Sequence, residues 1–316
     1  MAREPGRTPC AVASAGRGEP LLGTASRVRR WLLVEQPGPW GREALLESRM
    51  EERVARTLQS RSRRSGVRVV LVRRPRWADP GPRRRAYLVH TSPHHRWIES
   101  LDLDGEADLL DVDLSVLSSR SAPGVGAPGP ASVRLVCTNG RHDPCCADEG
   151  RPVVRALAEE GVDEVWESSH VGGDRFAANV VFLPTGVYYG RVPPERAGAL
   201  IRDHDDGVLD LDHYRGRCSL PPSAQAGEVF LRRELGERGR DALVVMESTP
   251  RGEHAASVVL VRGEERYWVH VGREAGDPEH LTCTDSGLSR PWRYRLLGWG
   301  PLAGPEADSG PWPEPP

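Results

Sequence analysis

Apolar positions in the first part of the chain form short runs that alternate with one amphipathic stretch. The runs have the length and the β-branched or aromatic content of strands. Strands are expected at residues 31–34, 67–72, 85–90 and 97–103. Residues 42–60 place Leu45, Leu46, Val54 and Leu58 among charged positions, which indicates a helix. The order strand, helix, strand, strand predicts an N-terminal α/β domain over residues 27–118.

A second series of elements fills residues 132–207. The apolar run 133–136 leads directly into Cys137, and a helix with Pro152 in its first turn is expected to end at Gly161. A strand at 165–170, a hairpin of 179–184 with 187–192 and a helix at 193–204 are then expected. The order β-α-β-β-β-α is the minimal succession of a thioredoxin-like domain, so the predicted fold class is α/β.

The rest of the chain divides into one more structured segment and three stretches without apolar periodicity. Residues 208–299 predict a C-terminal α/β segment, which either forms its own lobe or completes the sheet of the first domain. Its helix is expected at 223–235 and its strands at 242–246, 256–262, 266–272 and 292–297. The stretches 1–26, 119–131 and 300–316 are rich in proline, glycine and alanine. Their composition predicts two disordered tails and, at 119–131, a linker.

Composition narrows the class of protein. No apolar run in the 316 residues approaches the roughly 20 that a membrane-spanning helix needs. The N-terminal region lacks the apolar core of a secretory signal. A net charge of −2 argues against a dedicated nucleic-acid binder. These features predict a cytoplasmic protein that works with neither membrane nor nucleic acid.

Cysteine placement gives the first chemical signal. The six cysteines are too few and too uneven for a disulfide scaffold, yet Cys137, Cys145 and Cys146 fall within ten positions. In a cytosolic chain such a group favours metal or redox chemistry. Cys10, Cys218 and Cys283 are interpreted as a thiol in the tail and two packed thiols.

Two loop segments combine these thiols with other metal ligands. The segment CTNGRHDPCC runs from Cys137 to Cys146, and HVGGDRFAAN begins at His170. A [2Fe–2S] cluster needs two ligands for each iron. Two cysteines from one loop can serve one iron, and imidazole or carboxylate from the other loop can serve the second. Gly172 and Gly173 let the second loop fold tightly and let its backbone approach a cofactor.

These segments, with the hairpin VVFLPTGVYYGRV, resemble the sucrase/ferredoxin-like family. The resemblance is strongest over residues 132–192, a portion that in the family is similar to thioredoxin-like [2Fe–2S] ferredoxins. It implies a redox domain whose cluster is held by two cysteines eight residues apart and by a His-x-x-x-His pair. Cys137 and Cys146 match the cysteines, and His170 matches the first histidine.

The fourth ligand position departs from that pattern because Asp174 stands in place of the second histidine. Aspartate binds iron through oxygen, and its negative charge lowers the reduction potential relative to imidazole. Alternative donors for this position are His142, Cys145, Cys218 and Cys283. Arg175, next to Asp174, is expected either to form an ion pair or to stabilise the negative charge of a reduced cluster.

The favoured hypothesis is therefore an electron-transfer protein with a [2Fe–2S] cluster and an unidentified redox partner protein. A metal-free thiol oxidoreductase or sensor using Cys137 and Cys146 is the main alternative. A degenerate interaction domain without a cluster and a structural zinc site are two more, although Cys-x8-Cys is not a familiar zinc spacing. No spaced pair of carboxylates supports a glycosidase.

Overall fold

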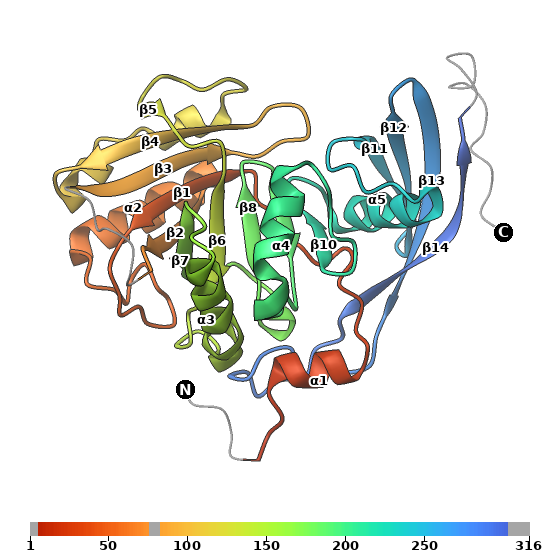
Figure 1. Cartoon of the computed structure of the whole chain (residues 1–316), viewed down its shortest axis with the longest axis horizontal. Helices are drawn as coiled ribbons and strands as arrows, with labels where there is room; N and C mark the ends of the chain where they lie inside the picture. The colour runs from red at the N-terminus through yellow and green to blue at the C-terminus, as the bar shows by residue number, and fades with distance from the viewer. Residues whose placement is uncertain (1–5, 76–82, 303–316) are drawn as a thin grey trace.

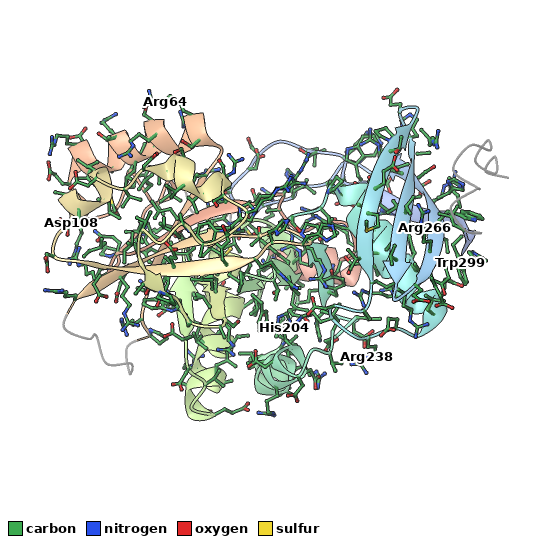
Figure 2. All side chains as sticks on the ribbon, turned by 90° about the horizontal axis from the view of Figure 1, so that it is seen from above. Arg64, Asp108, His204, Arg238, Arg266 and Trp299 are labelled. Atoms are coloured by element: carbon green, nitrogen blue, oxygen red, sulfur yellow. The ribbon has the colours of Figure 1, made fainter. Side chains whose placement is uncertain are left out.

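The computed structural model describes residues 6–75 and 83–302. Within these residues the strands form one ten-stranded sheet and one separate four-stranded sheet (Figure 1). Seen from above, the smaller sheet, with Arg266 and Trp299, lies at the opposite end of the molecule from Arg64 (Figure 2). No helix among the described residues is both long enough and apolar enough to cross a membrane.

The large sheet has the order β10-β9-β8-β6-β7-β2-β1-β3-β4-β5. Its strands are β1 (Arg30–Glu35), β2 (Arg68–Arg73), β3 (Arg84–His90), β4 (Trp97–Leu103), β5 (Ala127–Pro128), β6 (Val133–Cys137), β7 (Val165–Ser168), β8 (Val180–Leu183), β9 (Val187–Tyr189) and β10 (Tyr214–Arg217). The helices of the chain are α1 (Cys10–Gly16), α2 (Glu52–Ser65), α3 (Pro144–Glu159), α4 (Pro194–Asp205) and α5 (Pro222–Leu235). The strands expected from the apolar runs are thereby confirmed.

The thioredoxin-like unit consists of β6, α3, β7, β8, β9 and α4. Strand β6 pairs with β7 in parallel and with β8 antiparallel, and β8 pairs antiparallel with β9. Helices α3 and α4 pack against each other beside these strands (Figure 1). This arrangement confirms the α/β class and the predicted succession of elements.

The N-terminal region has the same strand order and directions as the thioredoxin-like unit. Strand β1 lies between β2, to which it is parallel, and β3, to which it is antiparallel, and β4 follows β3. The two units join where the carboxyl ends of β2 and β7 pair antiparallel, through Val72 with Ser168 and Arg73 with Glu167. One continuous sheet therefore carries both regions, and the loops that follow β1 and β6 meet at this junction.

Three expectations are corrected by the structure. Residues 1–26 are not a tail throughout, because α1 buries Cys10 and Ala11 against the core; residues 1–5 lie outside the described residues. The stretch 119–131 folds onto β4, since the buried Glu99 carboxylate accepts the backbone N–H groups of residues 124–126. Strand β5 within it pairs with β4. At the other end, the last strand continues to Pro301, and residues 303–316 lie outside the described residues.

Two helices begin elsewhere than predicted. Helix α2 starts at Glu52 because residues 41–47 close a turn, in which the N–H of Gly41 donates to the carbonyl of Glu47 at 2.7 Å. Helix α3 starts at Pro144 because the Asp143 side chain caps it and proline suits the first helical position. Pro152 lies inside α3, where its missing N–H removes one helical hydrogen bond. Cys145 and Cys146 consequently belong to the first turn of a helix.

The C-terminal segment forms its own lobe. Its strands β11 (Val244–Arg251), β12 (Ala255–Arg262), β13 (Glu265–Ala275) and β14 (Trp292–Pro301) make an antiparallel sheet. Helix α5 packs on this sheet, with Val229 and Leu231 in one core with Val258, Leu260 and Val269. From α5 onward the structure thus shows the separate lobe, one of the two arrangements left open by the sequence. The predicted boundary between residues 207 and 208 is corrected, because β10 pairs with β9 and belongs to the edge of the large sheet.

Helix α4 carries a buried histidine that predicts a pH effect on stability. His204 lies 3.3 Å from the Thr185 hydroxyl and 3.2 Å from the Tyr189 hydroxyl, and burial holds its pKa well below the ordinary value. The unfolded chain therefore takes up a proton below about pH 6.5 more readily than the folded protein does. We expect the free energy of unfolding to fall as the pH drops below that value, by up to about 1.4 kcal/mol per pH unit from this group.

Urea unfolding of the wild type and His204→Gln between pH 8 and pH 5 checks this expectation. The variant is expected to be less stable at pH 8 and to show a shallower loss of stability toward pH 5. Parallel curves for the two proteins would contradict the assignment of this pH effect to His204.

Candidate metal centre

The candidate site lies at the carboxyl ends of β6 and β7. These strands are parallel neighbours, and Cys137, the last residue of β6, is in register with Ser168, the last residue of β7. The loop after β6 leads into α3, whose first turn holds Cys146. The loop after β7 starts near His170 and contains a short 3-10 helix at Asp174–Phe176. The two predicted loop segments therefore face each other.

The structure brings the four predicted metal ligands together. The sulfur atoms of Cys137 and Cys146 and a ring nitrogen of His170 all lie within 4.8 Å of one another. Asp174 Oδ1 lies 3.1 Å from Cys146 Sγ and 2.9 Å from His170 Nδ1. Cys137, Cys146 and Asp174 are buried, and the His170 side chain is 21% exposed. Sulfur, nitrogen and oxygen donors thus lie together at a site that is largely shielded from solvent.

Mutual contacts shift the pKa values of these groups. A hydrogen bond with Cys146, reinforced by His170, holds the pKa of Cys137 well below its ordinary value despite burial. The same bond and burial raise the pKa of Cys146. Burial lowers the pKa of His170, but hydrogen bonds to Asp174 and Cys137 outweigh it and raise that pKa to about 9. Burial raises the pKa of Asp174, and the neighbouring His170 more than reverses this. These shifts favour the charged forms of Cys137, His170 and Asp174 and the neutral thiol of Cys146.

Of the alternative donors for the fourth position, His142 borders the site. Its ring stacks on that of His170, with 3.7 Å between centroids, and its Nε2 lies 3.8 Å from Asp174 Oδ2. Cys218 instead contacts the Thr91 hydroxyl at 3.5 Å. Cys145 and Cys283 face a different cluster, described below.

The glycines and Arg175 in the second loop contact other parts of the protein. Gly172 and Gly173 have positive φ values of 105° and 85°. A Cβ on Gly173 would lie 2.4 Å from the buried guanidinium of Arg215, so the close approach these glycines permit is to protein. Arg175 forms an ion pair with Glu19 at 2.8 Å, which is one of the two roles expected for it.

Arg215 holds the second loop in place, a role that the sequence did not reveal. Its side chain is fully buried and donates to the carbonyl of Gly172 at 3.0 Å and to Asn179 Oδ1 at 2.6 Å. It also donates to the hydroxyl of Thr24 at 3.0 Å. The residue lies in β10, far from the loop in sequence, so no local pattern links the two.

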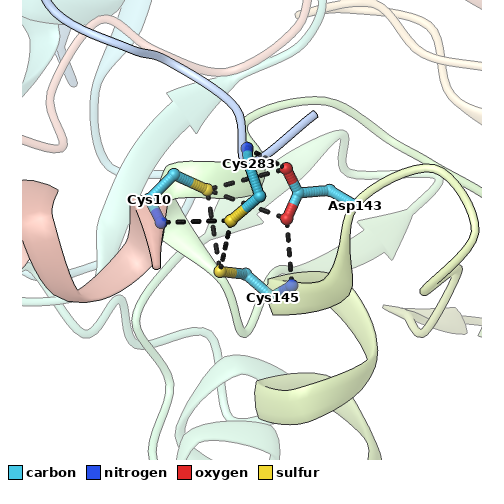
Figure 3. Close-up of side chains that lie close together, drawn as sticks. All are labelled: Cys10, Asp143, Cys145 and Cys283. Carbon is cyan, nitrogen blue, oxygen red and sulfur yellow. Dashed lines mark hydrogen bonds between the residues drawn. The ribbon is translucent and has the colours of Figure 1, made fainter. Parts of the chain in front are cut away.

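A second cluster of potential metal ligands lies beside the first. Cys10, Asp143, Cys145 and Cys283 are all buried, and their donor atoms lie within 4.8 Å of one another (Figure 3). From the sequence, Cys10 is expected in a tail and Cys283 among packed thiols, and Cys145 and Cys283 are considered only as alternative donors to the first site. Cys10 and Cys283 are 273 positions apart, so their meeting depends on the tertiary fold alone.

A cavity of about 680 Å³ opens next to the first loop. It lies at the junction of the two halves of the large sheet and is lined by Trp40, Arg73, Asn139, Arg141 and Arg151, among others. The lining also includes Asp148, and Arg73 forms an ion pair with Glu167 at 2.6 Å, so the excess of positive charge comes from Arg141 and Arg151.

Comparisons with known proteins find relatives of part of this chain. The sequence is 33% identical over 93 residues to "Altered inheritance of mitochondria protein 32" of Meyerozyma guilliermondii, covering 26% of this chain and 33% of the relative. The protein of that name from Debaryomyces hansenii is 30% identical over 93 residues, covering 26% and 34%. The chain thus matches about a third of the length of these curated relatives.

Among solved structures, a thioredoxin-like [2Fe–2S] ferredoxin from Aquifex aeolicus aligns with a TM-score of 0.26 and 20% identity, over 29% of this chain and 97% of the ferredoxin. A cysteine-to-serine variant of a ferredoxin of that description aligns with a TM-score of 0.24 and 21% identity, over 27% and 99%. The sequence model of the sucrase/ferredoxin-like family matches residues 21–216, which include both units of the large sheet and both loops of the site. The chain belongs to the sucrase/ferredoxin-like family.

Proposed function

We propose that the protein transfers single electrons through a [2Fe–2S] cluster held by Cys137, Cys146, His170 and Asp174. The observation that carries this proposal is the convergence of these four side chains from two separate loops at one end of β6 and β7. The loops belong to the part of the chain that matches the family, and the ferredoxins with similar folds bear [2Fe–2S] in their names.

The donor set fits such a cluster by its chemistry. Two thiols come from the segment between β6 and the first turn of α3, and an imidazole and a carboxylate come from the loop after β7. This division supplies two ligands for each iron. In the structure the donor atoms satisfy one another through hydrogen bonds of 2.9 and 3.1 Å, which metal coordination would replace. When bound, the cluster supplies a one-electron redox couple.

The surrounding residues control access and potential. The two sulfur donors are buried and the His170 ring is partly exposed, so the second loop is the side through which an electron reaches the surface. The carboxylate of Asp174 is anionic, which favours the oxidised state over what a second imidazole would give. Arg215 holds in place the loop that carries His170 and Asp174, by donating to the carbonyl of Gly172.

The cavity with Arg141 and Arg151 supports a partner or acceptor of negative charge at this side of the molecule. The cytoplasmic location expected from the sequence remains a prediction, whereas the name that the relatives share refers to mitochondria.

Substitutions of Asp174 test the proposal at its most unusual ligand. Wild-type protein purified without oxygen is expected to be coloured and to contain about two irons and two acid-labile sulfides per chain. Asp174→Ala removes one donor, so most of the iron should be lost. Asp174→His supplies imidazole, so the cluster should be retained with a higher reduction potential. Visible spectra, iron and sulfide analysis and redox titration of the three proteins provide the measurement.

A wild-type protein that stays colourless and iron-free after cluster reconstitution would overturn the proposal. Identical spectra and potentials in all three proteins would show that Asp174 is not a ligand and would move attention to His142, the neighbouring nitrogen donor.

A metal-free thiol function is the second candidate, and one observation favours it. Cys137 has a lowered pKa and hydrogen-bonds to the thiol of Cys146, which is an arrangement suited to oxidation of the pair. Loss of these two thiols on treatment of the metal-free protein with mild oxidant, reversed by a reductant, would support it. A cluster-free interaction domain would show neither iron nor reversible thiol loss.

A further inference from the structure

The second cluster joins three parts of the chain that lie far apart in sequence. Cys10 starts α1, Asp143 and Cys145 lie at the start of α3, and Cys283 lies between β13 and β14. Figure 1 shows α1 and the connection between β13 and β14 passing each other near the end of α3. All four residues are at most 3% exposed. We propose that Cys10, Asp143, Cys145 and Cys283 bind one zinc ion. This ion would hold α1 and the connection between β13 and β14 against the thioredoxin-like unit.

Distances between the donor atoms match a single tetrahedral ion. Cys145 Sγ lies 3.6 Å from Cys10 Sγ and 3.4 Å from Cys283 Sγ (Figure 3). Zinc–sulfur bonds of about 2.3 Å at tetrahedral angles place two sulfurs about 3.8 Å apart. The carboxylate oxygens of Asp143 lie 3.7 and 3.8 Å from Cys10 Sγ. Small side-chain movements therefore suffice to close all four donors on one ion.

Backbone hydrogen bonds hold the donors in this position. The N–H of Cys145 donates to Asp143 Oδ1 at 2.9 Å, and the N–H of Cys283 donates to Asp143 Oδ2 at 2.6 Å. The N–H of Cys10 donates to Cys283 Sγ at 3.2 Å. Such bonds to the outer side of metal ligands orient them.

Charge provides a separate argument for a cation. Asp143 is fully buried, and its carboxylate accepts two backbone N–H groups but forms no ion pair with a cationic side chain among the described residues. A buried negative charge is costly, and a bound cation offsets that cost. A divalent ion would compensate this charge and that of the deprotonated thiols. Three thiolates with one oxygen donor in tetrahedral geometry favour zinc over calcium or magnesium, which prefer sets of oxygen ligands.

The donor atoms are equally close at both sites, so distance alone does not distinguish a zinc ion from an iron–sulfur centre. Cys10 and Cys283, however, fall outside residues 21–216, the part of the chain that matches the family behind the [2Fe–2S] proposal. The zinc proposal uses none of the proposed iron ligands and stands independently of the proposed function.

Metal analysis of the full-length protein tests the proposal. Protein from zinc-supplemented medium, purified under reducing conditions, is expected to contain about one zinc per chain. Cys10→Ser and Cys283→Ser each remove one thiolate and should lose most of this zinc. The matched control is Cys218→Ser, because Cys218 is also fully buried but belongs to neither cluster and lies beside the Thr91 hydroxyl. It should keep its zinc, as should His170→Ala.

Cobalt titration of the zinc-depleted wild type provides a readout that does not depend on folding of the variants. We expect one equivalent of Co²⁺ to give intense visible bands typical of tetrahedral coordination and a near-ultraviolet band from thiolate ligands. The bands should disappear when one equivalent of Zn²⁺ is added.

The proposal is overturned if the wild type holds no zinc after incubation with Zn²⁺ and gives no such cobalt spectrum. The proposal is also overturned if Cys10→Ser and Cys283→Ser keep their zinc, or if the metal that they lose is iron. A disulfide among the three cysteines in protein kept reduced would overturn it as well. Iron and sulfide are measured in the same samples, so a colourless protein with one zinc would contradict only the [2Fe–2S] proposal.

Discussion

Cys146→Ala is expected to lose nearly all iron and the visible absorption of the protein, while Cys145→Ala keeps both. The two cysteines are consecutive in the first turn of α3, but their side chains face different clusters. Cys146 Sγ lies 3.1 Å from Asp174 and 4.0 Å from His170, so its removal leaves one iron without its second sulfur ligand. Iron and sulfide analysis of both variants, purified without oxygen, measures the effect.

Cys145→Ala is a closely matched control for Cys146→Ala because the two residues are adjacent. Both substitutions remove a buried thiol from the same helical turn and leave the same methyl group, so general effects on folding are closely matched. Cys145→Ala should instead lose zinc. Equal iron content in the two variants, or loss of iron from Cys145→Ala alone, would contradict the assignment of Cys146 as a ligand.

Glu228→Gln is expected to lower the free energy of unfolding by about 3–5 kcal/mol, the usual cost of removing one partner from a buried ion pair. Glu228 lies in α5 and is fully buried, as is Arg232, whose Nη2 is 2.9 Å from Glu228 Oε1. Arg217 donates to the same oxygen at 3.2 Å. The substitution leaves two guanidinium groups in the interior without their shared anion. Urea unfolding followed by circular dichroism measures the change.

The chain offers an exposed pair of the same kind as a control. Glu52 and Arg56 in α2 have the same spacing of four residues and a distance of 2.7 Å, but both side chains are more than two thirds exposed. Glu52→Gln should change the free energy of unfolding by about 0.5 kcal/mol or less, because water screens the exposed pair. Similar losses in the two variants would show that burial does not set the strength of the α5 pair.

Local pattern was sufficient to predict most elements of the large sheet. The apolar runs that became β1, β2, β6 and β8 are short, flanked by polar residues and rich in valine or leucine. This length and composition favour a buried strand over a helix. The start of α3 was misplaced because Pro152 was taken as a start signal, while Asp143 and Pro144 form the actual cap and first position. The sequence offers two possible starts for this helix, at Pro144 and near Pro152. The helix begins at Pro144 because the N–H of Cys145 donates to the Asp143 carboxylate, which caps that end.

The grouping of Cys137, Cys146, His170 and Asp174 could be predicted because these residues lie in two short segments at the ends of neighbouring strands. The second cluster could not, because Cys10 and Cys283 lie in stretches whose local sequence indicates only a tail and a loop. Their role follows from α1 and the C-terminal lobe reaching the same end of α3. Arg215 is a similar case, since its contacts with the second loop exist only in the assembled sheet.

The meeting of Cys10 with Cys283 also sets an order of events during protein synthesis. Cys10 is synthesised before Cys283, and the N–H contact that it makes with the sulfur of Cys283 waits until 273 further residues have been added. Asp143 and Cys145 are available midway, so the cluster stays incomplete until the segment after β13 has been made. A chain that stops before residue 283 lacks one of the four donors. Completion of this cluster therefore requires that α1, the start of α3 and the segment after β13 have all been made and have met.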